Sequence, residues 1–104
     1  MSFKRYEITL PTRFNDGSAV TAEPFHLTYE EVVERFGAVT VIPQSVRGSW
    51  THDGQRYEED NIRFYVDVED TVEAAEFFRK WKETLKSRFG QIDIWIVSYS
   101  IGIT

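Results

Sequence analysis

Two amphipathic segments of this chain end in the same tripeptide, Arg-Phe-Gly, at positions 35–37 and 88–90. Each tripeptide follows apolar residues at three- and four-residue steps, the spacing of a helix with one buried face. Each is followed by an apolar stretch rich in β-branched residues, AVTVI or QIDIWIV, which is typical of a strand. The glycine is expected to take the positive φ that closes a helix, and the phenylalanine to be buried where helix meets sheet. The chain is therefore interpreted as two similar halves, in which each helix leads back into one sheet.

Capping signals and terminal glycines set the limits of the two predicted helices. Thr28 and Glu31 have the spacing of a capping box, in which each side chain bonds the other's free backbone N–H. The first helix is therefore expected to run from Thr28 to Gly37. Asp70 is the expected cap of the second helix, which ends at Gly90. The residues expected to face the core are Tyr29, Val32, Val33 and Phe36 in the first helix, and Val72, Ala75, Phe78, Trp81, Leu85 and Phe89 in the second.

Four strands are predicted from alternating or continuous apolar stretches. They are Phe3–Leu10, Val39–Ile42 continued by Ser45–Thr51, Gln55–Glu59 continued by Ile62–Val68, and Ile92–Ile103. The dipeptide Asp53-Gly54 is a strong hairpin signal and joins the second strand to the third. Pro43 and Gly48 indicate that the second strand is an edge strand with a bulge or bend.

The element order β-α-β-β-α-β predicts an α+β ferredoxin-like sandwich that forms a single domain over residues 1–104. Because β-α-β crossovers are right-handed, both helices are expected on one face of a four-stranded antiparallel sheet. The expected strand order is 4-1-3-2, counted along the chain, with an extended hairpin between the second and third strands. A chain of this length buries enough surface to fold without disulfides or metal ions.

The alternation within the strands assigns side chains to the two faces of this sheet. The helix side is expected to receive Tyr6, Ile8, Leu10, Ile62, Phe64, Val66, Ile92, Ile94 and Ile96, and the open side Arg5, Glu7, Thr9, Arg63, Tyr65, Asp67, Trp95, Val97 and Tyr99. On the open side, the candidate interaction residues Tyr65, Trp95, Val97 and Tyr99 would form a larger apolar patch than scattered exposed residues usually make.

The sequence is compatible with several ways of covering this patch. Loops or the tail Ser100–Thr104 can fold over it, or a second copy of the chain can pack sheet to sheet or edge to edge through the last strand. A small molecule or a nucleic acid can also lie on such a face. The net charge of −5 and the absence of a Lys/Arg-Gly-Phe/Tyr motif argue against nucleic acid.

The hairpin region holds the polar residues that most invite a binding interpretation. His52 has acidic neighbours that suggest a base or a metal ligand, but an exposed hairpin tip spreads such side chains apart, so no metal site is predicted. Gly48 would let a ligand or another backbone approach closely beside Trp50. The candidate pocket residues are Arg5, Arg47, Trp50, His52, Tyr57 and Arg63.

Sequence motifs for catalysis are missing. The chain has no cysteine, which excludes a thiolate nucleophile and disulfides, and it lacks the common nucleotide-binding loops and the nucleophile elbow. No catalytic residue and no cofactor is therefore predicted, and a non-enzymatic role is favoured. No apolar run is long enough for a signal peptide or a membrane span, so the expected location is cytoplasmic.

Four stretches taken together resemble small bacterial proteins of an uncharacterised family, a domain of unknown function. They are KRYEITLPTRFNDGS, ERFGAVTV, the RGSW and DGQRYEED arms of the hairpin, and SRFGQIDIWIV. The chain is also similar to a broader group of bacterial domains of unknown function that share a G-x-W hairpin. The resemblance spans nearly the whole chain; it implies the ferredoxin-like fold and transfers no catalytic residue.

The leading interpretation is a non-enzymatic protein that acts by association, as a homodimer or as the partner of another protein, through the open sheet face. It follows from an uncovered aromatic face without a convergent acid, base or nucleophile. The alternative is a small-molecule-binding protein or small enzyme of the dimeric α+β-barrel kind.

Overall fold

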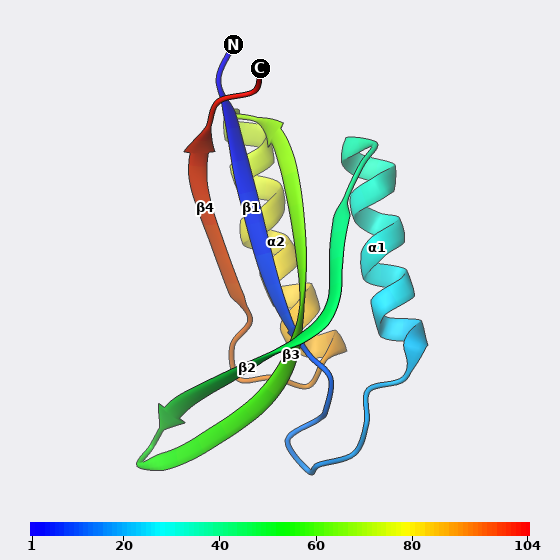
Figure 1. The fold of residues 1–104 in the computed structure, drawn as a ribbon, viewed down its shortest axis with the longest axis vertical. Coiled ribbons are helices and arrows are strands. Elements are labelled where there is room, and N and C mark those ends of the chain that lie inside the picture. The colour runs from blue at the N-terminus through cyan, green and yellow to red at the C-terminus, as the bar shows by residue number, and fades with distance from the viewer.

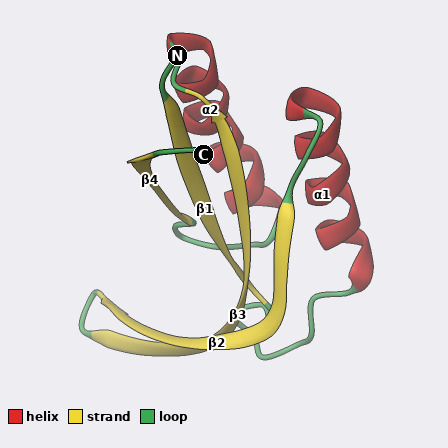
Figure 2. Ribbon diagram, turned by 45° about the horizontal axis from the view of Figure 1, so that its top comes forward, coloured by secondary structure: helices red, strands yellow, loops and turns green.

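The computed structural model has the predicted order of helices and strands along the chain (Figure 1). It describes the backbone of residues 1–104 and the side chains of residues 1–42, 51, 53–54 and 61–104. The elements are β1 (Phe3–Pro11), α1 (Ala22–Phe36), β2 (Thr40–His52), β3 (Gln55–Glu69), α2 (Val72–Arg88) and β4 (Trp95–Ile101). The sheet has the order β2-β3-β1-β4 and every neighbouring pair is antiparallel, which confirms the predicted topology. Both helices lie on the same side of the sheet (Figure 2).

The two Arg-Phe-Gly helix exits share their backbone geometry but differ in burial. Gly37 and Gly90 have φ values of 84° and 59°, so the predicted positive φ is confirmed at both. Phe89 is fully buried, whereas Phe36 is only half-buried, so the expectation of two equally buried rings is wrong. The Phe36 ring packs against the rings of Phe77 and Phe78 on α2, and part of its surface remains exposed.

The first helix begins at Ala22, and its cap residue Thr21 lies seven residues before the predicted cap Thr28. Pro24 lies in its first turn, where the missing proline N–H has no intrahelical partner to lose. Thr28 is fully buried inside the helix, and its hydroxyl donates to the Pro24 carbonyl at 2.7 Å. The Thr28–Glu31 spacing therefore does not mark a helix start in this chain.

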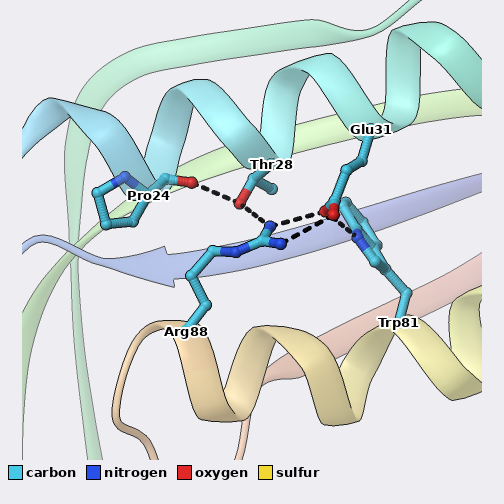
Figure 3. A network of polar contacts seen from close by, with 5 residues as sticks. All are labelled: Pro24, Thr28, Glu31, Trp81 and Arg88. Carbon is cyan, nitrogen blue, oxygen red and sulfur yellow. Dashed lines mark hydrogen bonds and ion pairs between the residues drawn. The ribbon is translucent and has the colours of Figure 1, made fainter.

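Thr28 and Glu31 instead take part in a polar network that joins the two helices (Figure 3). The guanidinium of Arg88 on α2 donates to both carboxylate oxygens of Glu31, at 2.7 and 2.8 Å, and to the Thr28 hydroxyl at 3.0 Å. The Trp81 indole N–H donates to the same carboxylate at 2.9 Å. The hydrogen bonds from Arg88 lower the pKa of Glu31. In the described part of the chain, every buried side-chain nitrogen and oxygen has a hydrogen-bond partner. The two helices therefore pack together without leaving a buried polar group unsatisfied.

The start of the second helix also differs by one residue from the prediction. Thr71, not Asp70, is the cap residue, and its hydroxyl oxygen accepts the Ala74 N–H at 3.1 Å. The buried side of the helix also differs from the prediction in its first turn. Ala74 faces the core, while Val72 and Ala75, both expected there, are exposed.

The core lies between the helices and one face of the sheet. Its buried apolar side chains are Tyr6, Ile8, Leu10, Val20, Val32, Phe64, Val66, Val68, Ala74, Phe78, Trp81, Leu85, Phe89 and Ile94. The stacked rings of Tyr6 and Phe78, with centroids 3.9 Å apart, join the first strand to the second helix. Alternate residues are buried in β1 from Tyr6 to Leu10 and in β3 from Phe64 to Val68, as expected for a sheet covered on one face.

The last strand is shorter than predicted because a polar turn precedes it. The Asp93 carboxylate accepts the backbone N–H of Ile94 at 2.9 Å and pairs with Lys82 at 3.0 Å. The strand therefore starts at Trp95, and Ile92 lies outside it with its side chain exposed, not on the helix side as expected. Ile94 is buried, and Ile96 is half-buried.

The hairpin formed by β2 and β3 extends beyond the rest of the sheet (Figure 1). Its two-residue turn is Asp53-Gly54, and both residues have positive φ, which confirms the hairpin signal. The pairing register shifts between Ile42 and Val46, the stretch that contains Pro43, so the predicted irregularity in this edge strand is confirmed. Among the described residues, no helix combines the length and apolar character needed to cross a membrane.

Candidate functional site

The open face of the sheet carries nine side chains in three rows across β3, β1 and β4. The rows are Asp67, Arg5 and Tyr99; Tyr65, Glu7 and Val97; and Arg63, Thr9 and Trp95. These residues alternate along β1 and β3 with the buried residues that contact the helices, so they point away from the core. The structure therefore brings together on one face all the side chains that the strand alternation assigns to it.

Hydrogen bonds and an ion pair satisfy the polar groups in the middle of this face. Arg5 pairs with Asp67 through two bonds of 2.7 and 2.9 Å, and its guanidinium lies 4.4 Å from the centre of the Tyr65 ring. The Tyr99 hydroxyl donates to Glu7 at 2.8 Å. Hydrogen bonding to Asp67 raises the pKa of Arg5, and hydrogen bonding to Glu7 raises the pKa of Tyr99. These groups can be covered by a partner without first breaking bonds within the chain.

The apolar part of the face lies along β4. Trp95 is 67% exposed, Tyr99 42% and Val97 38%, so each keeps more than a third of its surface in contact with solvent. Ser100 and Ile101 belong to the strand, and the short tail after it leaves these three residues uncovered. Tyr65 is half-buried because the Arg5 side chain lies over its ring. The open face therefore combines a satisfied polar centre with an aromatic margin.

Two positions of β2 that the sequence pattern does not indicate also lie on this face. Thr40 lies opposite Tyr65, and Ile42 lies opposite Arg63, so both belong to the open side. Their neighbour Val41 pairs with Phe64 on the core side. The alternation of Thr40, Val41 and Ile42 was the available signal, but Pro43 interrupts it before a period can be recognised.

The predicted pocket residues do not form one group in the described part of the structure. Arg5 and Arg63 lie on the open sheet face, in different rows. The other four candidates, Arg47, Trp50, His52 and Tyr57, have side chains outside the described residues, although the backbone places Trp50 opposite Tyr57. Among the described side chains, no group of three or more His, Cys, Asp or Glu residues could hold a metal ion.

Comparison with known proteins shows a shared fold. No family model and no curated protein matches the chain. A divalent cation tolerance protein, CutA1, from Thermus thermophilus is similar over 98% of this chain and 86% of its own, with a TM-score of 0.66 and 20% identity. A phage SAM lyase in complex with S-methyl-5′-thioadenosine is similar over 98% of this chain and 90% of its own, with a TM-score of 0.71 and 16% identity.

A third solved structure, CutA from Synechococcus elongatus PCC7942, covers 96% of this chain and 77% of its own, with a TM-score of 0.64 and 13% identity. Identities this low establish the fold alone, and they confirm the ferredoxin-like arrangement expected from the sequence. These neighbours carry functional names, so the fold is not confined to the uncharacterised bacterial proteins that the sequence resembles.

Proposed function

We propose that the protein acts by association, and that a second copy of the chain binds at the apolar margin of the open sheet face. The contact residues are Tyr65, Trp95, Val97 and Tyr99. The observation that carries this proposal is the exposure of three neighbouring apolar side chains on β4, beside polar groups that are already paired. A homodimer is the simplest assembly that covers them.

Elementary energetics supports this use of the face. Apolar surface removed from water contributes about 25 cal/mol per Å². Trp and Tyr are the residue types that most often dominate the energy of protein contacts. The bonds of Arg5 with Asp67 and of Tyr99 with Glu7 persist when the face is covered, so desolvation leaves no unpaired charge among these four groups.

Sedimentation across a range of concentrations tests the proposal with two variants. The wild-type protein is expected to be a dimer or larger oligomer, and Trp95→Glu is expected to weaken association by about 100-fold, because it places a charge in the contact. Val72→Glu is the matched control, since Val72 is also an exposed apolar residue but lies at the start of α2. A wild-type protein that stays monomeric at every concentration contradicts the proposal.

The second candidate function is the binding of a small molecule, and the likeness to the phage SAM lyase favours it. That structure contains S-methyl-5′-thioadenosine, and its fold covers nearly all of this chain. Calorimetric titration with this nucleoside tests the candidate directly. Saturable binding is expected if the function is shared. Absence of heat at two well-separated temperatures, up to about 1 mM, where a complex would have only about −4 kcal/mol of binding free energy, excludes it.

A further inference from the structure

The outer edge of β4 lacks the features that normally protect an exposed strand edge. In the described chain β4 ends the sheet, with β1 on one side and no strand on the other (Figure 1). Protected edges carry charged residues, proline or a bulge, since their unpaired backbone groups otherwise pair with another chain. The seven residues WIVSYSI contain none of these, and their register with β1 is unbroken. The opposite edge, β2, has a register shift near Pro43.

We infer that this edge pairs antiparallel with β4 of a second copy about a two-fold axis at Ser98, which joins the two sheets into one of eight strands. Ser98 is the midpoint of Trp95–Ile101, so this register uses the whole strand. Directly opposite residues of an antiparallel pair point to the same side. Both copies therefore keep their helices on one side and their open faces on the other.

The side chains of β4 are complementary to themselves in this register. On the open face, Val97 lies opposite Tyr99 of the second copy, and Trp95 lies opposite Ile101 of the second copy. On the other face, Ile96 meets Ser100, and Ser98 meets Ser98. Each pair is uncharged, and pairs of an aromatic with an aliphatic or β-branched residue stabilise neighbouring strands. This self-complementarity identifies a second copy, rather than an unrelated chain, as the partner that fits.

This inference rests on the proposed function, because it specifies how the associating copy is seated. Edge pairing sets Trp95, Val97 and Tyr99 beside side chains of the second copy. It removes Tyr65 from the contact proposed above, since β1 separates β3 from β4. Sheet-to-sheet packing, in contrast, would cover Tyr65 and leave Ser98 outside, because Ser98 lies on the other side of the strand. A substitution at Ser98 therefore tests edge pairing, and a substitution at Tyr65 tests sheet-to-sheet packing.

A single introduced cysteine tests the register, because the chain has no cysteine of its own. Directly opposite residues have Cα atoms about 4.5–5.5 Å apart, a separation that a disulfide spans. In Ser98→Cys, mild oxidation is therefore expected to convert nearly all of the dimer into a covalent dimer. Ser87→Cys, an exposed position on α2, is the matched control and is expected to remain uncrosslinked.

Charge variants give a second measurement that does not depend on oxidation. Ser98→Lys and Ser98→Glu are each expected to weaken self-association by about fivefold, because like charges lie directly opposite each other. Mixing the two variants is expected to restore wild-type affinity as a heterodimer, and Tyr65→Glu is expected to have no effect.

The outcomes separate the two levels of the proposal. A wild-type dimer that Tyr65→Glu disrupts, while the Ser98 variants neither crosslink nor weaken it, overturns the edge pairing and leaves the proposed function standing. A wild-type protein that is monomeric at every concentration overturns the proposed function, and the edge pairing with it.

Discussion

Replacing Phe89 with alanine is expected to lower the free energy of unfolding by about 3–5 kcal/mol, the range for a fully buried phenylalanine. Its ring has no exposed surface and packs edge to face against Phe25, with centroids 5.2 Å apart. Because total stabilities are about 5–15 kcal/mol, this loss would unfold a large fraction of a marginally stable chain. Urea denaturation followed by circular dichroism measures the change.

The equivalent residue of the first Arg-Phe-Gly tripeptide supplies the control. Phe36→Ala is expected to cost only about 1–2 kcal/mol, because the half-buried ring removes less apolar surface from water. The two substitutions make the same chemical change at the same place in the repeat. Equal losses for the two variants would contradict the difference in burial.

Glu31→Ala is expected to lower the free energy of unfolding by about 2 kcal/mol, since it removes hydrogen bonds between a carboxylate and its donors. The substitution leaves the guanidinium of Arg88, only 15% exposed, and the Trp81 indole N–H without their shared acceptor. Glu76→Ala is the matched control, because Glu76 pairs with Arg79 on the exposed surface of α2, and little change is expected there. A Glu76 variant as unstable as the Glu31 variant would contradict this assignment.

The stabilisation by Glu31 is also expected to depend on pH. Hydrogen bonds from Arg88 lower the pKa of Glu31 in the folded state below the usual value of 4.5. The carboxylate therefore stabilises the fold fully above about pH 4.5, and this stabilisation is lost as the pH falls through the lowered folded-state pKa. Urea midpoints of the wild type and Glu31→Ala, compared from pH 7 downward, should converge. A difference between the two proteins that widens on acidification would contradict this.

Local signals predicted the elements of the fold well. The alternation in Phe3–Leu10 and the turn at Asp53-Gly54 depend on a few neighbouring residues, and both agree with the structure. The positive φ of Gly37 and Gly90 agrees for the same reason. Each half of the chain has two strands joined through one helix, and only a few sheet topologies fit this order. The preference for right-handed crossovers selects the observed topology among them.

The spacing of Thr28 and Glu31 suits two different structural roles, and the sequence does not distinguish them. A threonine and a glutamate three residues apart suit a helix start, but they also lie on one side of a helix, where another helix can contact them. Arg88, the donor that decides between these uses for Thr28 and Glu31, is 57 residues from Glu31 in the sequence. No local pattern contains that information.

On the open face, too, the sequence predicts which side chains are present but not which contacts they make. The strand period alone places Arg5, Tyr65 and Tyr99 on the side away from the helices. It does not show that Arg5 pairs with Asp67 and lies over Tyr65, or that Tyr99 bonds Glu7, because these contacts depend on the register between strands far apart in sequence.

The sequence by itself determined the number and order of the helices and strands, the hairpin turn and the topology, because backbone sterics and side-chain periodicity act over a few residues. Only the tertiary structure decided which phenylalanine of the repeat is fully buried, where Thr28 and Glu31 find their partners, and that β4 is left with an uncovered, uncharged edge. Each of these depends on which distant segments meet in space, and that depends on how the whole chain packs.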